Sequence, residues 1–143
     1  MSRGPEPRDP LFEPYWEGTT RGEIRVQRCV DCGAHRWPPR PICVECRGFE
    51  CDWVAAADSG TLHSWTRVEH QTHPDMPPPY TVAIVEVDAP ATLRFVGRLD
   101  LPDGTGPEAE MRLKARFDPA PDGTYSLVNW IPDTVRENDM DTN

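Results

Sequence analysis

Residues 29–48 read CVDCGAHRWPPRPICVECRG, and this stretch decides the fold of the N-terminal third of the chain. Cys29 and Cys32 form one C-x2-C pair, and Cys43 and Cys46 form a second pair after ten intervening residues. Each pair is typical of a knuckle, a tight turn that points two thiolates at one ion, and two facing knuckles supply the four sulfurs of a tetrahedral site. The spacing therefore predicts a metal-bound ribbon with these four cysteines as ligands.

Zinc is the metal that this ligand set favours, with rubredoxin-type iron as the alternative. Because sulfur fills all four positions, none remains for a substrate, and we expect the ion to be structural and not catalytic. A module of roughly 30 residues cannot bury enough apolar surface to be stable alone, so the bound metal would have to stabilise its fold. The fifth cysteine, Cys51, lies beside Phe49 and Trp53 and is interpreted as a small hydrophobic residue.

Arginines gather around the cysteine pairs. Residues 21–47 contain six arginines against three acidic residues, a local charge of +3. Guanidinium groups match phosphate oxygens in bidentate fashion. Two interpretations stay open for the segment Arg36, Trp37 and Arg40. It is either a solvated face that donates N–H groups toward the thiolates, or an anion site for a phosphorylated ligand.

Composition and charge exclude several classes of protein. The 17 prolines exclude a mostly helical chain, because an interior proline costs a helix about 3 kcal/mol. No window approaches 18 apolar residues and the first 30 residues hold no apolar run, so we expect neither a membrane span nor a secretory signal, and a cytoplasmic location. The net charge of −9 lies entirely in residues 51–143, where 16 acids outnumber seven bases. Such a surface repels phosphate backbones and opposes nucleic-acid binding.

The pattern before the cysteines predicts a linker and one short helix. Residues 1–10 contain three prolines and are typical of a linker. A helix with one apolar face follows, and we expect it to end at Gly18. The residues of that face are Leu11, Phe12, Tyr15 and Trp16. The face either covers a core edge or anchors a partner.

From Cys51 onward the pattern changes to strands separated by turn residues. The expected strands span 52–57, 60–70, 80–88, 92–100, 109–117 and 125–131. Two of them alternate apolar residues with arginines, which predicts an arginine-bearing outer face. Five main strands at this spacing predict a small barrel or sandwich, followed by a disordered acidic tail. The expected domains are a linker (1–10), a helix with the zinc ribbon (11–50), the barrel (51–132) and the tail (133–143).

No catalytic motif accompanies these elements. His63, His70 and His73 lie near a proline-stiffened loop at 71–79, but no carboxylate lies at a spacing that would complete a second metal site. The loop itself is either an ordinary surface loop or a binding loop. No sequence pattern assembles a nucleophile with a base, so we assign no catalytic residue.

In this order the elements resemble a family described as domain of unknown function 35. The similarity covers roughly residues 10–132 and rests on the aromatic helix, the two cysteine pairs, and three later segments. These segments are Gly60–Thr66, Pro79–Ala83 and Met111–Leu113. The resemblance implies a mainly β protein with a short N-terminal helix, a rubredoxin-like zinc ribbon and a five-stranded OB-fold barrel. The family's usual glycine before Met111 is Glu110 here, which leaves the local bulge geometry open.

The resemblance also implies a function. Family members are accessory proteins that pair with thiolase-fold enzymes, including lipid-transfer-protein-like aldolases, and some form the C-terminal part of a MaoC-like enoyl-CoA hydratase in steroid side-chain degradation. The partner would cleave a β-hydroxyacyl-CoA thioester by a retro-aldol reaction, in a heterotetramer built on the partner's dimer. The present chain would stabilise or complete that partner, and could channel substrate from a hydratase. Its linker-like start would suit a domain that follows such a hydratase.

Coenzyme A would then be the ligand of the complex. Its phosphates would attract Arg36 and Arg40, and Trp37 would pack on the adenine ring. The alternative function is an oligonucleotide-binding OB-fold module. Such modules use a basic, aromatic groove, which the acidic C-terminal half opposes.

Overall fold

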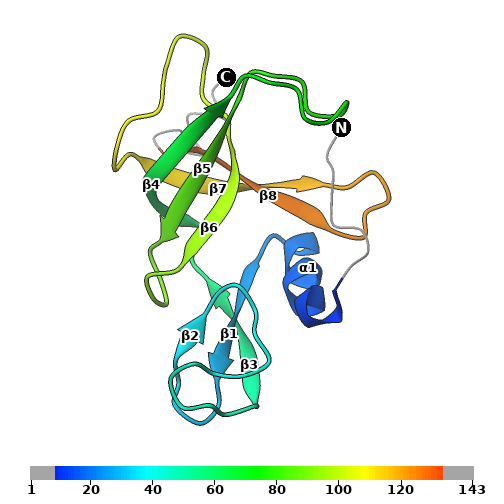
Figure 1. Ribbon diagram of the computed structural model, residues 1–143, viewed down its shortest axis with the longest axis vertical. Helices are drawn as coiled ribbons and strands as arrows, with labels where there is room; N and C mark the ends of the chain where they lie inside the picture. Colours follow the sequence, from blue (N-terminus) through cyan, green and yellow to red (C-terminus); the bar gives the residue numbers. More distant parts are fainter. Residues whose placement is uncertain (1–8, 134–143) are drawn as a thin grey trace.

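The computed structural model describes residues 9–133, which form a small ribbon sheet with a helix at its side and a closed barrel beyond it (Figure 1). The ribbon sheet has the strand order β2-β1-β3, with antiparallel neighbours. The N-terminal elements are η1 (Pro10–Phe12), α1 (Glu13–Thr20), β1 (Ile24–Cys29), β2 (His35–Arg36) and β3 (Cys51–Ala56). Most of the expected linker and of the expected acidic tail lies outside the described residues.

The barrel consists of five strands in the closed order β4-β5-β6-β8-β7. Its strands are β4 (Ser59–Val68), β5 (Tyr80–Val87), β6 (Arg94–Leu99), β7 (Arg112–Pro119) and β8 (Ser126–Pro132). All neighbours are antiparallel except β6 and β8, which run parallel where Leu99 meets Trp130. The mainly β class with a short helix, a ribbon and a five-stranded barrel is confirmed. No helix within the described part of the chain is long and apolar enough to cross a membrane.

The strand that begins at Cys51 belongs to the ribbon, whereas the sequence analysis placed it with the barrel. β3 pairs with β1 over six residues, from Cys29 opposite Cys51 to Ile24 opposite Ala56. This pairing lets Ile24 and Val26 of β1 be fully buried. A strand that follows a metal ribbon can thus return to the ribbon sheet before the chain enters the barrel.

Helix α1 extends past Gly18 and ends at Thr20, so the prediction of its end was two residues short. Gly18 has a packing role instead: a Cβ atom there would lie 2.7 Å from Cγ of Arg25. The hydroxyls of Thr19 and Thr20 each donate a 2.6 Å hydrogen bond to a carbonyl one turn earlier, which keeps the last turn closed. The chain then leaves the helix through Gly22, whose φ of 73° suits glycine.

Five aromatic rings join the helix, the ribbon and the barrel. The Trp37 ring stacks on Phe95 of β6 with ring centroids 4.9 Å apart, and Tyr15 of α1 lies 4.5 Å from Trp37. Trp16 meets Tyr125, next to β8, at 5.3 Å. Tyr15 is buried, so the apolar helix face covers a core edge and is not an exposed partner anchor. One hydrophobic core therefore spans both modules.

The outer face of the barrel carries paired arginines, as the alternation predicted. The pairs are Arg94 with Glu86, Arg98 with Asp100, Arg112 with Asp88, and Arg116 with Asp100 and Asp118. Arg112 donates two hydrogen bonds to Asp88, at 2.8 and 2.5 Å, and these lower the pKa of that carboxyl to about 2. Asp88 follows β5 and Arg112 begins β7, so the pair helps to close the barrel.

Glu110 occupies the position where the resemblance expects glycine, and its backbone has the conformation that glycine favours. Its φ is 64°, in the left-handed region. Its N–H donates a 3.1 Å hydrogen bond to the carbonyl of Leu62, and the N–H of Leu62 donates to Met111 at 2.9 Å. The chain thus keeps the local geometry although a side chain is present. A non-glycine residue in this region is strained by about 1–2 kcal/mol.

We predict that Glu110→Gly stabilises the barrel by up to about 1 kcal/mol, because relief of the strain exceeds the entropy that glycine loses on folding. The free energy of unfolding, measured by urea denaturation, checks this. Glu110→Gln removes the charge and keeps the Cβ atom, so it should give no gain. An equal gain in both variants would attribute the effect to charge and contradict the backbone explanation.

Candidate metal centre

The two cysteine pairs form knuckles of the same geometry. In the first, the N–H of Gly33 donates a 2.9 Å hydrogen bond to the carbonyl of Cys29; in the second, Arg47 donates to Cys43 at 2.8 Å. Gly33 and Arg47 both have positive φ values, 77° and 64°. The sequence indicated the turn at Gly33. It gave no signal for the equivalent turn at Arg47, because a non-glycine residue rarely adopts a positive φ.

The knuckles bring four sulfur atoms together as the spacing predicted. All four Sγ atoms lie within 4.8 Å of one another, and two of the separations are 3.5 Å (Cys29 to Cys46) and 3.7 Å (Cys32 to Cys43). A tetrahedral zinc ion with Zn–S bonds of about 2.3 Å requires sulfurs about 3.8 Å apart. These separations are far longer than a disulfide bond, and the cysteines are free. The four residues therefore fit a zinc ion.

Backbone N–H groups of the knuckles point at the sulfurs and favour the charged form of Cys29 and Cys43, whereas burial and the neighbouring thiols raise the pKa of Cys32 and Cys46. The N–H groups of Cys46 and Glu45 lower the pKa of the Cys43 thiol to about 6. The N–H of Cys32 is the main cause of a lowered pKa at Cys29. Thiolates are the form that binds a metal. A zinc ion held by these four sulfurs would have no open coordination position. It would therefore stabilise the ribbon and would not bind a substrate.

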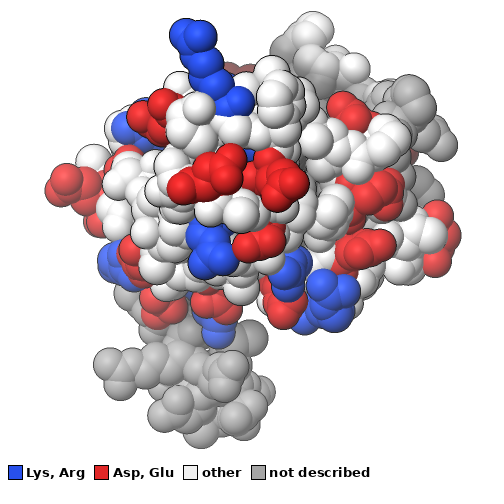
Figure 2. Space-filling view, turned by 90° about the horizontal axis from the view of Figure 1, so that it is seen from below, with Lys and Arg blue, Asp and Glu red and all other residues white. Residues whose placement is uncertain are grey.

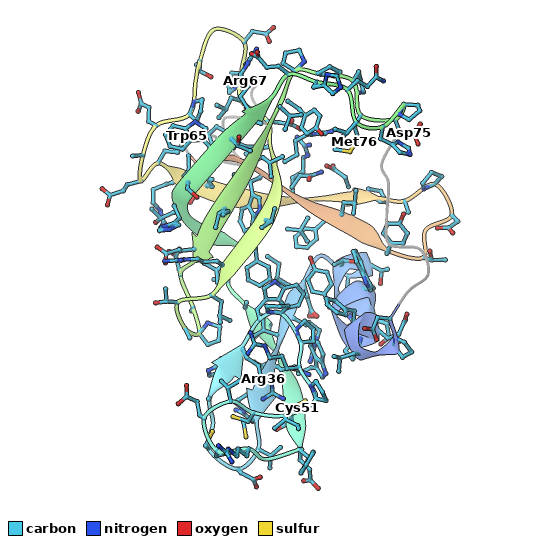
Figure 3. The ribbon with its side chains drawn as sticks, viewed as in Figure 1. Arg36, Cys51, Trp65, Arg67, Asp75 and Met76 are labelled. Atoms are coloured by element: carbon cyan, nitrogen blue, oxygen red, sulfur yellow. The ribbon has the colours of Figure 1, made fainter. Side chains whose placement is uncertain are left out.

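Cys51 stays outside this group of four. It lies opposite Cys29 in the β1–β3 register but is not one of the four clustered ligands (Figure 3). Its side chain is half-buried, so the interpretation as a small hydrophobic residue fits it in part. The neighbouring Phe49, in contrast, is 75% exposed.

The segment between the knuckles has a different geometry from the one expected of a coenzyme A site. The Trp37 ring packs against Tyr15 and Phe95, so it is not free to stack on adenine. Arg36 is 9% exposed, and its Nη2 donates a 3.0 Å hydrogen bond to the carbonyl of Arg40. Trp37 therefore packs the ribbon against the barrel, and Arg36 bonds within the ribbon. Of Arg36, Trp37 and Arg40, only Arg40 is exposed, and a coenzyme A contact at this segment stays a prediction that rests on it.

The structure does not bring the three histidines together. His63 Nδ1 lies 3.7 Å from Glu86 on the barrel, and His73 Nδ1 accepts a 3.1 Å hydrogen bond from the backbone of Asp75 in the loop. Within residues 9–133 the four cysteines are the one group with the geometry of a metal site. The loop that holds His73, Asp75 and Met76 extends from the barrel between β4 and β5 (Figure 3).

The sequence analysis missed an apolar surface at the end of the ribbon, which we call the ribbon tip. Its residues are Val30, Ile42, Val44 and Phe49, exposed by 50, 43, 63 and 75%. Together with Cys43 and Arg47, three of them line an open depression of about 630 Å³. Figure 2 shows this end of the molecule, with charged side chains of both signs interspersed among uncharged ones. The signal in the sequence was the presence of valine inside each knuckle, where a solvated turn would carry polar residues.

A four-cysteine ribbon joined to a five-stranded barrel defines the class of zinc-ribbon and OB-fold proteins. Residues 16–52 match the model of the ChsH2 rubredoxin-like zinc ribbon domain, and residues 53–118 match the ChsH2 C-terminal OB-fold domain. The two models together span most of the chain, so the chain belongs to the ChsH2 zinc-ribbon and OB-fold family. The resemblance seen in the sequence is thereby confirmed.

Two curated relatives are hydratase subunits. The chain is 29% identical over 133 residues to the "3-oxo-4,17-pregnadiene-20-carboxyl-CoA hydratase alpha subunit" of Mycobacterium tuberculosis, an alignment of 93% of this chain and 40% of that protein. It is 38% identical over 80 residues to a "Probable enoyl-CoA hydratase alpha subunit" of Thermomonospora curvata, covering 56% and 24%. The chain thus spans less than half the length of either relative.

Solved structures show the same architecture. A chain of the "Ltp2-ChsH2(DUF35) aldolase" matches with a TM-score of 0.79 and 27% identity, covering 90% of this chain and 98% of that one. A DUF35 protein of unknown function from Sulfolobus solfataricus matches with a TM-score of 0.60 over 90% and 89% of the two chains. At 16% identity, the second match supports the fold alone.

We predict that elemental analysis finds about one zinc ion per chain, bound by the four thiolates. Cys32→Ser should lose the metal and unfold the ribbon locally while the barrel strands stay formed, as amide hydrogen exchange would report. Cys51→Ser is the matched control and should keep the full zinc content. Iron in place of zinc, or a Cys29–Cys46 disulfide in freshly reduced protein, would contradict the prediction.

Proposed function

We propose that this chain is a non-catalytic subunit of a thiolase-fold acyl-CoA aldolase, which it stabilises or completes. The partner cleaves a β-hydroxyacyl-CoA thioester by a retro-aldol reaction, with a steroid side-chain thioester as its substrate. The observation that carries this proposal is the match to a chain of the Ltp2-ChsH2(DUF35) aldolase over nearly the whole of both chains. That chain belongs to an assembly whose name states an aldolase, and its length and fold are those of the present chain.

The metal centre supports an accessory role. Four sulfur ligands around one ion leave no position at which the metal could polarise a substrate. The centre instead holds the ribbon tip in a fixed shape at the far end of the molecule from the barrel (Figure 1). A rigid, metal-stapled tip suits a protein that contacts another protein.

The ribbon tip is the surface that we assign to the aldolase partner. Large apolar side chains are costly to leave in water, and a contiguous exposed group of them marks an interaction site. Phe49 and Val44 project furthest, with 75% and 63% of their surfaces exposed. Aromatic residues at the centre of an interface contribute most of its binding energy. Phe49 is therefore the residue on which we expect the complex to depend most.

The names of the two relatives support a proposal for the reaction that precedes the aldol cleavage. Both are alpha subunits of enoyl-CoA hydratases, and each is more than twice as long as this chain. Hydration of an enoyl-CoA yields the β-hydroxyacyl-CoA that an aldolase would cleave. We therefore propose that a hydratase, fused to this chain or bound to it, supplies the substrate by channelling. The assembly is a heterotetramer built on the dimer of the aldolase, since most such complexes are symmetric.

Co-expression with the aldolase from the same genome tests the assembly. We expect a stable complex, and we expect Phe49→Ser to weaken it by roughly ten- to a hundredfold, since burial of a phenylalanine contributes about 1.5–3 kcal/mol. Sedimentation velocity and calorimetry measure the stoichiometry and Kd. Val96→Ser is the matched control, because Val96 is 67% exposed on the barrel.

Two outcomes of that experiment would count against the proposal. A complex of unchanged affinity with Phe49→Ser, in protein that keeps its zinc, would exclude the ribbon tip as the interface. A chain that stays monomeric beside the aldolase and turns over acyl-CoA alone would contradict the accessory role.

The remaining coenzyme A contact has its own test in the complex. Exposed ion pairs contribute about 0.2–1 kcal/mol, so Arg40→Ala should raise KM for the acyl-CoA roughly two- to fivefold with little change in kcat. Arg28→Ala, which removes an exposed arginine of the same ribbon, should leave both constants unchanged. An unchanged KM in the Arg40 variant would show that Arg40 does not contact the acyl-CoA.

A further inference from the structure

Strand β4 is paired along one edge and open along part of the other. Its first edge pairs with β5 from Gly60 to Val68. Its second edge pairs with β7 only over Ser59–Thr61, and Leu62 adds two hydrogen bonds to the residues just before β7. Within residues 9–133, no backbone partner meets the second edge between Ser64 and Val68. An open edge of this kind is a template for another extended chain.

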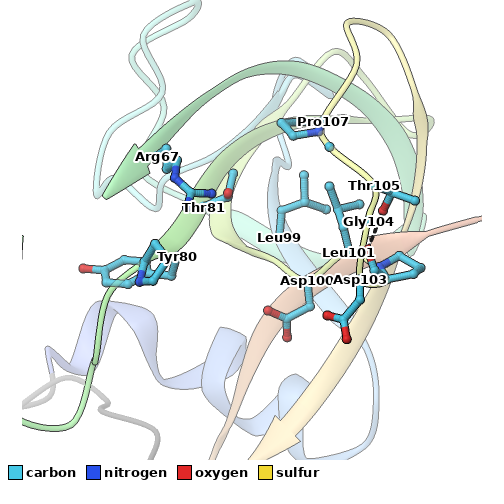
Figure 4. A pocket seen from close by; sticks show the side chains of 13 residues that line it. Arg67, Tyr80, Thr81, Leu99, Asp100, Leu101, Asp103, Gly104, Thr105 and Pro107 are labelled. Atoms are coloured by element: carbon cyan, nitrogen blue, oxygen red, sulfur yellow. Dashed lines mark hydrogen bonds between the residues drawn. The ribbon is translucent and has the colours of Figure 1, made fainter. Parts of the chain in front are cut away.

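A cavity lies at the end of β4, close to this open edge. The loop from Asp100 to Met111 connects β6 to β7, and it reaches β4 only at Leu62. Between the loop and the end of β4 lies a cavity of about 490 Å³, lined by Arg67 of β4, by Thr81 of β5 and by residues 99–107 (Figure 4). Only Arg67 of the open stretch lines this cavity, and the described part of the loop forms no backbone hydrogen bond to Ser64–Val68.

The wall opposite the open edge is acidic. The loop carries Asp100, Asp103, Glu108 and Glu110 and no basic residue. Asp100 is paired with Arg98 and Arg116, whereas the other three side chains are exposed. Arg67, the one basic residue among those that line the cavity, is engaged by Glu69 at 2.8 Å. Asp103 lines the cavity, whereas Glu108 and Glu110 lie farther along the loop, so a segment added at this end of β4 would meet an acidic loop.

The open edge also presents an aromatic side chain. Trp65 is 40% exposed in the middle of the unpaired stretch, next to Arg67 (Figure 3). Strand addition gains affinity from main-chain hydrogen bonds and specificity from side-chain contacts of this kind. An indole at the edge gives an added strand an apolar surface to cover.

From this geometry we propose that the edge Ser64–Val68 accepts an extended, basic segment of a partner polypeptide as an added β-strand. The backbone of the segment pairs with β4, its apolar side chains cover Trp65, and its Lys or Arg side chains face the acidic loop. A single-stranded nucleic acid, the other extended polymer that OB-folds bind, is disfavoured because the loop repels phosphates. The site is separate from the ribbon tip and does not depend on the aldolase assignment.

The test uses the full chain and a capped peptide of four Lys-Val repeats as the probe. Amide NMR spectra at physiological salt should show shifts centred on residues 64–68, and hydrogen exchange of those amides should slow when the peptide binds. The same peptide with glutamate in place of lysine should not bind. A version N-methylated at alternate residues loses the N–H groups of one edge, so it should not bind either.

Charge reversal in the protein separates the site from general attraction to an acidic chain. The double variant Asp103→Lys with Glu108→Lys should weaken binding on the order of tenfold, since like charges now face each other. Glu45→Lys with Glu50→Lys changes the net charge equally on the ribbon and should leave the affinity unchanged. Trp65→Ala should weaken binding in protein whose remaining amide spectrum is unaltered.

Three results would overturn the proposal. They are shifts confined to residues away from β4, equal losses of affinity in the two double variants, and full binding of the N-methylated peptide. The first would place the peptide elsewhere, the second would reduce the effect to net charge, and the third would exclude main-chain pairing.

Discussion

The contact between Trp37 and Phe95 is the constraint on which the rest of the molecule depends. Trp37 belongs to the loop between the two knuckles, and Phe95 belongs to a barrel strand, so their stacking fixes the ribbon against the barrel. Tyr15 closes the same cluster from the helix. Offset aromatic pairs add about 0.5–1.5 kcal/mol to the burial of their surface. The ribbon and the barrel therefore share one hydrophobic core.

Features that depend on neighbouring residues could be predicted from the sequence. The spacing of the four cysteines determines the metal centre, because a knuckle is a local turn whose geometry needs few distant contacts. Alternation along strands such as Arg94–Leu99 and Arg112–Pro119 indicates the barrel strands for the same reason, and the limits of the barrel strands differ from the predicted ones by at most three residues. Glu110 is different: the sequence left its geometry open, and the structure shows a positive φ there with hydrogen bonds to the distant Leu62.

Features that depend on distant contacts could not be predicted. Trp37 between Arg36 and Arg40 has the composition of a ligand-binding segment, but its ring stacks on Phe95, far later in the chain. Gly18 has the composition of a helix end, although the side chain of Arg25 is what requires glycine there. The ribbon tip escaped notice because exposure is a property of the assembled surface, and valine inside a short turn gives only a weak signal.

Two residues, Ala57 and Asp58, connect the ribbon sheet to the barrel. The N–H of Ala57 donates to the carbonyl of Ala89 at 2.9 Å, and the carbonyl of Asp58 accepts from Ala115 at 2.7 Å, so the connection is held by the barrel on both sides. A connection this short and this well bonded cannot act as a hinge. The separation between the ribbon tip, at one end of the molecule, and the open edge of β4, toward the other end, is therefore fixed. Proteins bound at both places would therefore be held at one set distance from each other.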